Sequence, residues 1–339
     1  MISRLEKYNY NLPERLIAQK PVVPRDRSRL LIYKRKNDEI IYDNFLNLTK
    51  YLPKKSVLVF NETKVLPARI FLKKETGGRV EILYLKRKNK LVEALADKKL
   101  AINSKIFLNS KKGFLVVGQN KNIYYLKPLF SNVENFFQKY GQMPIPPYIK
   151  NSPLSRKELK KKYQTIFAKK IGSSAAPTAS LHFTKRLLNK IKKSGFDIKF
   201  ITLHVGLGTF ASLTEENFKK KKLHEEYYNI DKKTASFLNQ AKKKGRPIIA
   251  VGTTVARTLE SATKNKGLKN LSGKTDLFIQ EGDRFNFIDS LITNFHLPKS
   301  SLLMLVSALV GREKLLNIYK SAIKKEFRFY SFGDGMLII

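Results

Sequence analysis

The sequence contains no cysteine, and it is poor in acidic residues and in long apolar runs. Without a thiol, the chain can form no disulfide, no thiolate metal site and no cysteine nucleophile. The longest apolar run, SLLMLVSALVG at 301–311, is about half the length that a bilayer requires. We therefore expect a buried helix there and no membrane partner. The N-terminal segment lacks the apolar region of a secretion signal, which predicts a cytoplasmic protein.

Positive charge is what the sequence has in excess. Its 339 residues include 67 Lys+Arg against 27 Asp+Glu, which gives a formal net charge of +40. Clustered Lys and Arg gain free energy by releasing counterions from phosphates, so this charge favours nucleic acid or another anionic surface as a partner. The alternative is a lysine-rich composition that only covers the exposed faces. With 42% apolar residues, the chain can bury a core in one large or two smaller domains.

The periodicity of the apolar residues changes along the chain. From about residue 56 to residue 130 it has the period of two that is typical of strands, and several of these strands are joined by Lys/Asn/Gly turns. After the proline-rich connector at 141–150, helical patterns alternate with short apolar strands. We predict an α/β (mixed α+β) main domain, made discontinuously of residues 1–67 plus 149–339. The remaining residues, 68–148, should form an inserted all-β, barrel-like domain.

Two glycine-containing segments resemble nucleotide-binding loops without fitting them. HVGLGTFA at 204–211 matches G-x-G-x-x-A, but a dinucleotide site needs its helix to open on the glycines. The capping residues Ser212 and Thr214 come later instead. Glu225 also lies near the start of the segment LHEEYYNI, whereas the dinucleotide-binding motif requires an acidic residue at the end of a strand. In GLKNLSGKT the glycines are one residue too far apart for a phosphate loop.

A third segment, RPIIAVGTTVARTLESA at 246–262, predicts a buried strand followed by a helix that begins near Gly252. Free backbone amides at the helix start, the hydroxyls of two threonines and the guanidinium of Arg257 would together bind an anion or a polar ligand. The alternative is an ordinary capped helix in which Arg257 pairs with Glu260.

The chain has only four histidines, and each neighbours a glycine, a proline or a strand end. Such positions present side chains to a cleft, although a single histidine on an apolar strand is more often part of a core. The spacing provides no His-x-x-x-His or paired carboxylates, so it does not favour a metal site. General acid/base catalysis or a hydrogen bond to a ligand is the better interpretation. The four are His182, His204, His224 and His296.

Longer motifs follow one another along essentially the whole chain. They are YNYNLPERLIAQKPVVPRDRSRLL, LVFNETKVLPARIF, GGRVEILYL, GQMPIPPYI, YQTIFAKKIGSSAAPTASLHFT, ITLHVGLGTF, HEEYYNI, AVGTTVARTLES, ITNFHLPKSSLLMLVSALVGRE and YSFGDGMLI. In this order they resemble the S-adenosylmethionine:tRNA ribosyltransferase-isomerases of queuosine biosynthesis. The chain departs from that family's pattern at a few positions, namely Glu62, Lys64, Ser180, Glu281 and Gly335, where the family prefers Asp, Arg, Gly, Pro and Ala.

The resemblance implies an enzyme that uses S-adenosylmethionine as a ribosyl donor. The acceptor would be 7-aminomethyl-7-deazaguanine at the wobble position of a tRNA anticodon loop, and the products would be epoxyqueuosine-tRNA, adenine and methionine. No metal and no cofactor beyond the co-substrate S-adenosylmethionine would be needed, and we expect a monomer. Such chemistry requires a base beside the sulfonium, an acid for departing adenine and polar groups for the ribose hydroxyls.

The catalytic residues implied by this chemistry are His204 and His296 as an acid/base pair, with His182 as a third site. Substrate-binding residues would be polar or charged side chains within or beside the motifs: Thr254, Arg257, Glu260, Asp289, Arg312 and Tyr163. The first two suit the methionine carboxylate, the two acids suit the ribose or the sulfonium, and the last two suit the anticodon.

Two other function classes remain open from the residues alone. A non-catalytic RNA-binding protein would explain the charge, but it would leave the histidine motifs without a role, and no RNP-type aromatic pattern is present. A methyltransferase would use the same co-substrate, and the poorly fitting glycine-rich segment is the main argument against it. The products formed from S-adenosylmethionine separate the three.

Overall fold

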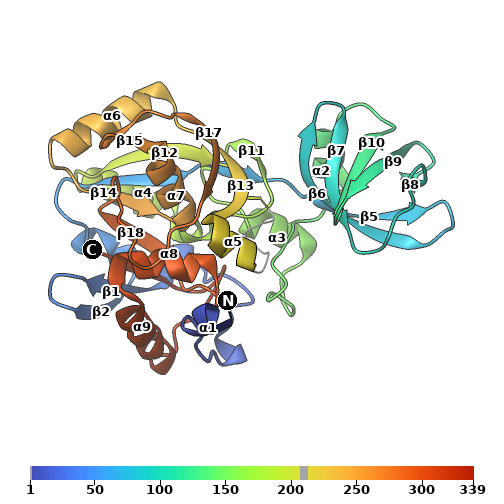
Figure 1. Cartoon of the computed structure of the whole chain (residues 1–339). Helices are drawn as coiled ribbons and strands as arrows, with labels where there is room; N and C mark the ends of the chain where they lie inside the picture. The colour runs from blue at the N-terminus through green and yellow to red at the C-terminus, as the bar shows by residue number, and fades with distance from the viewer. Residues whose placement is uncertain (1, 207–212) are drawn as a thin grey trace.

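The computed structural model describes residues 2–206 and 213–339 of the chain. Its strands form a large mixed sheet and a closed barrel, which projects as a separate lobe on the right of Figure 1. The helices are α1 (Ile2–Glu6), α2 (Val133–Tyr140), α3 (Arg156–Lys162), α4 (Lys185–Lys193), α5 (Glu215–Lys220), α6 (Lys232–Lys243), α7 (Thr253–Ala262), α8 (Ser301–Val310) and α9 (Arg312–Lys324), with 3-10 turns η1 (Glu14–Leu16), η2 (Arg25–Arg27), η3 (Phe45–Lys50) and η4 (Thr178–His182).

The large sheet has the order β17-β13-β12-β3-β14-β18-β19-β1-β2. In chain order these strands are β1 (Arg29–Lys34), β2 (Glu39–Asn44), β3 (Val57–Asn61), β12 (Asp197–Leu203), β13 (Lys222–Asn229), β14 (Ile248–Val251), β17 (Ser272–Leu277), β18 (Ser290–Asn294) and β19 (Gly335–Ile338). The central strands β12, β3, β14 and β18 run parallel to one another. Their carboxyl ends therefore meet at one edge of the sheet.

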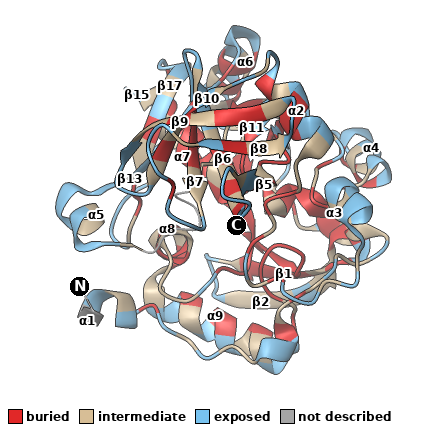
Figure 2. Ribbon diagram, turned by 90° about the vertical axis from the view of Figure 1, so that its right-hand side faces the viewer, coloured by how far each residue is buried: buried red, intermediate tan, exposed pale blue. Residues whose placement is uncertain are grey.

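The central strands are apolar on both faces because helices and turns cover the sheet on both sides. In β3, Val57 and Val59 belong to a core with α6, α7, α8 and α9, whereas Leu58 and Phe60 belong to a core with η3, η4 and α4. Continuous burial of this kind is typical of parallel strands between two helical layers. Figure 2 shows the buried residues gathered inside and exposed ones on the outer faces of α3, α4 and α6.

The barrel is made of six antiparallel strands, in the order β10-β7-β6-β5-β8-β9. They are β5 (Arg69–Lys74), β6 (Arg79–Lys88), β7 (Leu91–Ala96), β8 (Lys105–Asn109), β9 (Lys112–Asn120) and β10 (Ile123–Pro128). Alternate residues point inward and form a core of their own, into which α2 inserts Val133, Phe136 and Phe137. Because the barrel closes on itself, it has no free strand edge.

The chain enters and leaves the barrel at one place. Arg69 and Gln142 exchange backbone hydrogen bonds of 3.1 and 2.7 Å. Beside them, a Cβ on Gly141 would lie 1.8 Å from the carbonyl oxygen of Pro67. Only glycine allows the two connections to approach this closely.

The structure confirms the predicted fold class, a mixed α/β sheet with an inserted barrel. The apolar run at 301–311 is the buried helix α8, as expected. The period-two pattern did not reveal α2, which packs against the barrel core. The division into residues 1–67 plus 149–339 and 68–148 stays a prediction. Most of the glycine-rich segment, residues 207–212 with Ser212, lies outside the described residues.

Two short pairs complete the fold. The strands β4 (Thr63–Val65) and β11 (Lys170–Ser173) pair in parallel beside the carboxyl end of β3. The strands β15 (Thr263–Lys264) and β16 (Gly267–Leu268) form a small hairpin after α7.

Candidate active site

A cavity lies at the carboxyl edge of the parallel strands. It is lined by Val205 after β12, Gly252 after β14 and Phe295 after β18, and it holds about 710 Å³ of space, part of it open to solvent. Along the chain β3 is followed by β12 on one side and later by β14 on the other. Open α/β sheets bind ligands at such a reversal of strand order, outside the carboxyl ends.

The cavity wall is aromatic and neutral. Rings of Tyr148, Tyr163, Phe295 and Tyr330 line it together with small apolar residues. Burial raises the pKa of Tyr148 to about 12 and also raises that of Tyr163, so both phenols stay protonated at neutral pH. No Asp, Glu, Lys or Arg is among the lining residues within 2–206 and 213–339. A cationic ligand would therefore meet aromatic faces, which attract cations.

Thr254 lies at the start of α7 and in the cavity wall, and its contact with a methionine carboxylate stays a prediction. The helix begins at Gly252, whose φ of 99° favours glycine, and no side chain caps it. The first amides of α7 therefore face the cavity without an internal acceptor. This is a polar, weakly positive end that suits a carboxylate.

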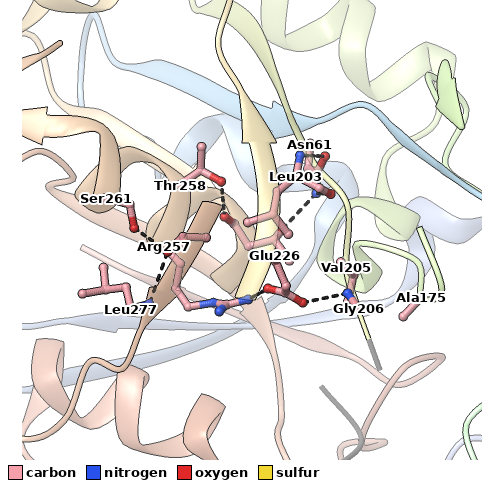
Figure 3. A network of polar contacts seen from close by, with 12 residues as sticks. Asn61, Ala175, Leu203, Val205, Gly206, Glu226, Arg257, Thr258, Ser261 and Leu277 are labelled. Carbon is pink, nitrogen blue, oxygen red and sulfur yellow. Dashed lines mark hydrogen bonds and ion pairs between the residues drawn. The ribbon is translucent and has the colours of Figure 1, made fainter. Parts of the chain in front are cut away.

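Arg257 lies behind this wall, in an ion pair with Glu226 of β13. Both side chains are buried, and the second oxygen of Glu226 accepts a 2.9 Å hydrogen bond from the backbone N–H of Gly206 (Figure 3). The arginine therefore neither reaches the cavity nor pairs with Glu260. Residues near the end of β13 alternate between buried and exposed, and Glu226 and Tyr228 share the buried face. This period of two in the sequence could have indicated that Glu226 is a buried partner for Arg257.

The two predicted acids also lie outside the cavity wall. Glu260 accepts hydrogen bonds of 2.7 to 3.0 Å from the backbone N–H groups of residues 286–288. Asp289 binds Lys242 at 2.7 Å and the N–H of Ile248 at 2.8 Å. Asp289 precedes β18 and the cavity follows it, so the strand separates them. Contacts of these acids with a ribose or a sulfonium stay predictions.

The two residues expected to meet an anticodon lie in different places. Tyr163 is almost fully buried in the cavity wall, where the edge of its ring packs against Phe332. Arg312 begins α9 outside the wall, and both its backbone and its guanidinium contact Glu281, at 2.9 and 3.5 Å. Glu281, one of the departures from the resembled family, thus has a local partner.

His296 is the predicted histidine that lines the cavity. It follows β18, and the chain then turns through Pro298 and Lys299, which has a left-handed φ of 57°. Its Nε2 lies 2.8 Å from Oγ1 of Thr293, and its backbone N–H donates to the hydroxyl of Tyr319 at 2.9 Å. Burial lowers the pKa of His296 to about 3, so at neutral pH the ring is uncharged.

His182 is buried beneath the cavity, stacked on Phe45 with ring centroids 4.1 Å apart. Its Nε2 lies 3.2 Å from the amide nitrogen of Asn294. Burial, together with the charges of Arg328 and Arg25, lowers the pKa of His182 to about 3. The ring is therefore a neutral core group, and its catalytic role stays a prediction.

His204 directly follows β12, but its side chain is not part of the cavity wall. Its Nδ1 is 2.9 Å from Oγ1 of Thr63, and Gly172 packs against its ring. Burial lowers the pKa of His204. The neighbouring Val205 lines the cavity instead. His204 and His296 are thus not brought together at the wall, and their pairing stays a prediction. His224 is exposed on β13.

Sequence reasoning missed several polar lining residues, namely Thr293, Asn294 and Ser331. The first two end the otherwise apolar strand β18, in the segment ITNFHLP, and polar groups at the end of a buried strand were an available signal. Ser331 lies far along the chain, 2.6 Å from the hydroxyl of Tyr148. Nothing local in the sequence connects these two.

The described part of the chain contains no group of three or more His, Asp or Glu side chains placed to hold a metal ion. None of its helices combines the length and the apolar character needed to cross a membrane.

Comparison with known proteins matches the chain over its length. The model of a family described as "Queuosine biosynthesis protein" matches residues 5–338. The S-adenosylmethionine:tRNA ribosyltransferase-isomerase of Carboxydothermus hydrogenoformans is 48% identical, over 99% of this chain and 100% of the relative. That of Staphylococcus haemolyticus is 46% identical, over 99% of each. The crystal structure of S-adenosylmethionine tRNA ribosyltransferase from Thermotoga maritima is 31% identical with a TM-score of 0.56, over 98% of this chain and 100% of that one.

Proposed function

The chain belongs to the queuosine-biosynthesis family of S-adenosylmethionine:tRNA ribosyltransferase-isomerases, and on that basis we propose the reaction that it catalyses. It moves the ribosyl group of S-adenosylmethionine onto 7-aminomethyl-7-deazaguanine at the wobble position of a tRNA. The products are epoxyqueuosine-tRNA, adenine and methionine. The observation that carries this proposal is the match along the whole chain to relatives that bear this enzyme name.

The cavity at the carboxyl edge of the sheet is the S-adenosylmethionine site in this proposal. Its aromatic lining suits both the adenine ring and the sulfonium, which an aromatic face attracts by about 0.5–2 kcal/mol. The uncapped start of α7 at Gly252 and Thr254 suits the methionine carboxylate. The absence of carboxylates among the described lining residues favours aromatic contacts with the sulfonium over the ion pairs expected from the sequence.

His296 is the base of the reaction in this proposal. It lines the cavity, and its neutral imidazole is the state that can accept a proton from the carbon beside the sulfonium, although a lowered pKa makes it a weaker base than a free histidine. The same lowered pKa argues against an imidazolium there that would protonate departing adenine. In this proposal Nε2–H donates to Oγ1 of Thr293 at 2.8 Å, which holds the orientation of the ring and leaves the lone pair of Nδ1 to accept the proton.

The tRNA meets the protein through its anticodon loop. The net charge of +40 supports binding to the phosphate backbone, while the splayed wobble base supplies selection, as is usual for single-stranded RNA. The enzyme acts as a cytoplasmic monomer and uses no metal.

Product analysis tests the proposal. The full chain is incubated with S-adenosylmethionine and an anticodon stem-loop that carries the deazaguanine precursor, and adenine, methionine and S-adenosylhomocysteine are quantified with and without EDTA. We expect equal amounts of adenine and methionine, in both conditions. An unmodified stem-loop is the matched control and should support no release, because it lacks the amine acceptor.

Each other product pattern identifies another function. S-adenosylhomocysteine would mean methyl transfer, and RNA binding without any turnover would mean a binding protein. Release that stops with EDTA would mean that a metal takes part.

A further inference from the structure

Two asparagines end parallel strands of the large sheet that β14 separates, and their side chains differ in one respect. Asn61 ends β3 and Asn294 ends β18, and both are buried. The Oδ1 atom of Asn61 accepts from the N–H groups of Thr63 and Leu203, both at 3.1 Å. Its Nδ2 donates to the carbonyl of Leu203 at 3.0 Å. The amide of Asn61 is thus satisfied at both ends by the protein.

The amide of Asn294 is satisfied at one end only. Its Nδ2 donates to the carbonyl oxygens of Tyr330 and Asp334, at 3.1 and 3.3 Å, and lies 3.2 Å from Nε2 of His182. Its Oδ1 is buried and has no hydrogen-bond partner among the residues that the structure describes. A rotation of the amide by 180° would face this oxygen against two carbonyl oxygens. The two carbonyls therefore fix the orientation, and Oδ1 stays the unpaired atom.

Asn294 lines the cavity, between Thr293 and Phe295. A buried acceptor without a donor destabilises the folded state, and native proteins contain few of them. A ligand that supplies the donor is one explanation for such a group, and for Asn294 its place in the cavity wall favours that explanation. The other described polar groups of the wall nearby, the hydroxyl of Ser331 and the imidazole of His296, already have partners, Tyr148 and Thr293.

We propose that Oδ1 of Asn294 accepts a hydrogen bond from the adenosyl part of S-adenosylmethionine and positions it against His296. The donor is either a ribose hydroxyl or the exocyclic amine of adenine, since both are uncharged donors that suit a neutral amide oxygen. This role rests on the proposed function, because it assumes that the cavity holds that co-substrate. His182 fits the same role indirectly, since its unprotonated Nε2 accepts from Asn294 and keeps the amide in place.

Wild-type protein supplies the first test, which needs no variant. Adenosine is compared with purine riboside, which lacks the amine, and with 2′-deoxyadenosine and 3′-deoxyadenosine, by calorimetric binding to the full chain. The analogue that lacks the donor to Oδ1 should bind about tenfold more weakly than adenosine, as expected for one lost hydrogen bond. Its identity distinguishes the amine from the hydroxyls. Equal binding of all four nucleosides would overturn the proposal.

The variant Asn294→Ala supplies the second test. Its KM for S-adenosylmethionine should rise about tenfold, and it should bind adenosine no better than wild type binds the weakest analogue. The matched control is Asn239→Ala, a half-buried asparagine of α6 that pairs with the backbone of Leu268 away from the cavity. This control should lower the melting temperature and leave KM unchanged.

The outcomes separate the possible failures. A lower melting temperature of Asn294→Ala with unchanged KM and nucleoside affinity would mean that Oδ1 binds a water molecule, and the proposal would be wrong. If wild type releases no adenine from S-adenosylmethionine, the proposed function fails, but the nucleoside series still decides whether Asn294 binds a nucleoside.

Discussion

The barrel and the large sheet differ in where their contacts come from. Within the barrel, most paired strands follow one another in the chain, and the side chains alternate simply between core and surface. The cavity beside the large sheet draws its wall from segments between residues 148 and 331, and none of its described lining residues comes from β5–β10 or α2. Regular local pairing thus makes a stable unit, whereas the candidate chemistry gathers where distant segments end together.

The comparison implies that the two regions can be perturbed separately. The barrel has its own core, and the sheet has one on each face. Changes in the barrel should alter stability and leave the binding of S-adenosylmethionine intact, while changes at the carboxyl edge should alter turnover.

The largest effect is expected from Phe114→Ala in the barrel. Phe114 is fully buried and packs against the rings of Phe130 and Phe136, with centroids 5.2 and 5.6 Å away. Removal of such a ring costs about 3–5 kcal/mol of unfolding free energy, which urea titration measures. The half-buried Leu108 is the control, and Leu108→Ala should cost less. A KM for S-adenosylmethionine that rises with the loss of stability would show that the two regions are coupled.

The next effect is on catalysis, from His296→Ala. Loss of a general base lowers kcat by about a hundredfold or more, which corresponds to about 2.7 kcal/mol of activation free energy. Adenine release measures kcat, and circular dichroism checks the fold. His224→Ala changes an exposed histidine of β13 and should be nearly silent. Similar small losses in both variants would argue against the assignment of His296.

A third effect concerns pH and arises only beside the sheet. Burial holds the pKa values of His182 and His296 at about 3, against 6.5 ordinarily. Between these values the unfolded chain binds more protons, so the free energy of unfolding falls as the pH decreases from 6.5 toward 3. The loss is about 1.4 kcal/mol per pH unit for each imidazole.

Urea titrations at about pH 7, 6 and 5 measure how the free energy of unfolding changes with pH across this range. His182→Asn should remove the contribution of that one imidazole, about 1.4 kcal/mol per pH unit, whereas His224→Asn should leave the slope unchanged. An unchanged slope in His182→Asn would mean that this ring is already charged in the folded protein.

The smallest effect is a gain of stability at Ser180. Its side chain is fully buried in η4, and its hydroxyl has no partner in the described residues. The resembled family prefers glycine there. Ser180→Ala removes the unpaired hydroxyl and should raise the unfolding free energy by about 1 kcal/mol, seen as a higher melting temperature. A lower melting temperature would mean that the hydroxyl is satisfied in solution.

Another departure from the family, Gly335, has a steric explanation. A Cβ at this position would lie 2.9 Å from the ring of Phe45 and from the carbonyl oxygen of Thr293. An alanine there would require a shift of the strand end or of the ring, so this chain packs Phe45 more closely than the pattern with alanine would allow.

Much of the fold could be predicted because its causes are local. The period of two between β5 and β10 predicts strands without long-range information, and Gly252 followed by Thr253 and Thr254 predicts the start of α7. The apolar run of α8 predicts a buried helix for the same reason. The long motifs together indicated the family. All of these depend on residues that are close to one another in the chain.

The partners of the polar side chains were decided only by the tertiary structure. Arg257 pairs with Glu226 rather than Glu260 because the fold brings the side chain of Glu226 on β13 within reach of the guanidinium. Asp289 and His296 lie close together in the sequence, yet they flank opposite ends of β18, because an extended strand of five residues separates its two ends by about 16 Å. The sequence determined which groups are present and which elements carry them. The packing of strands from distant parts of the chain determined which of those groups face one cavity, since hydrogen-bond partners and burial depend on neighbours in space and not on neighbours in sequence.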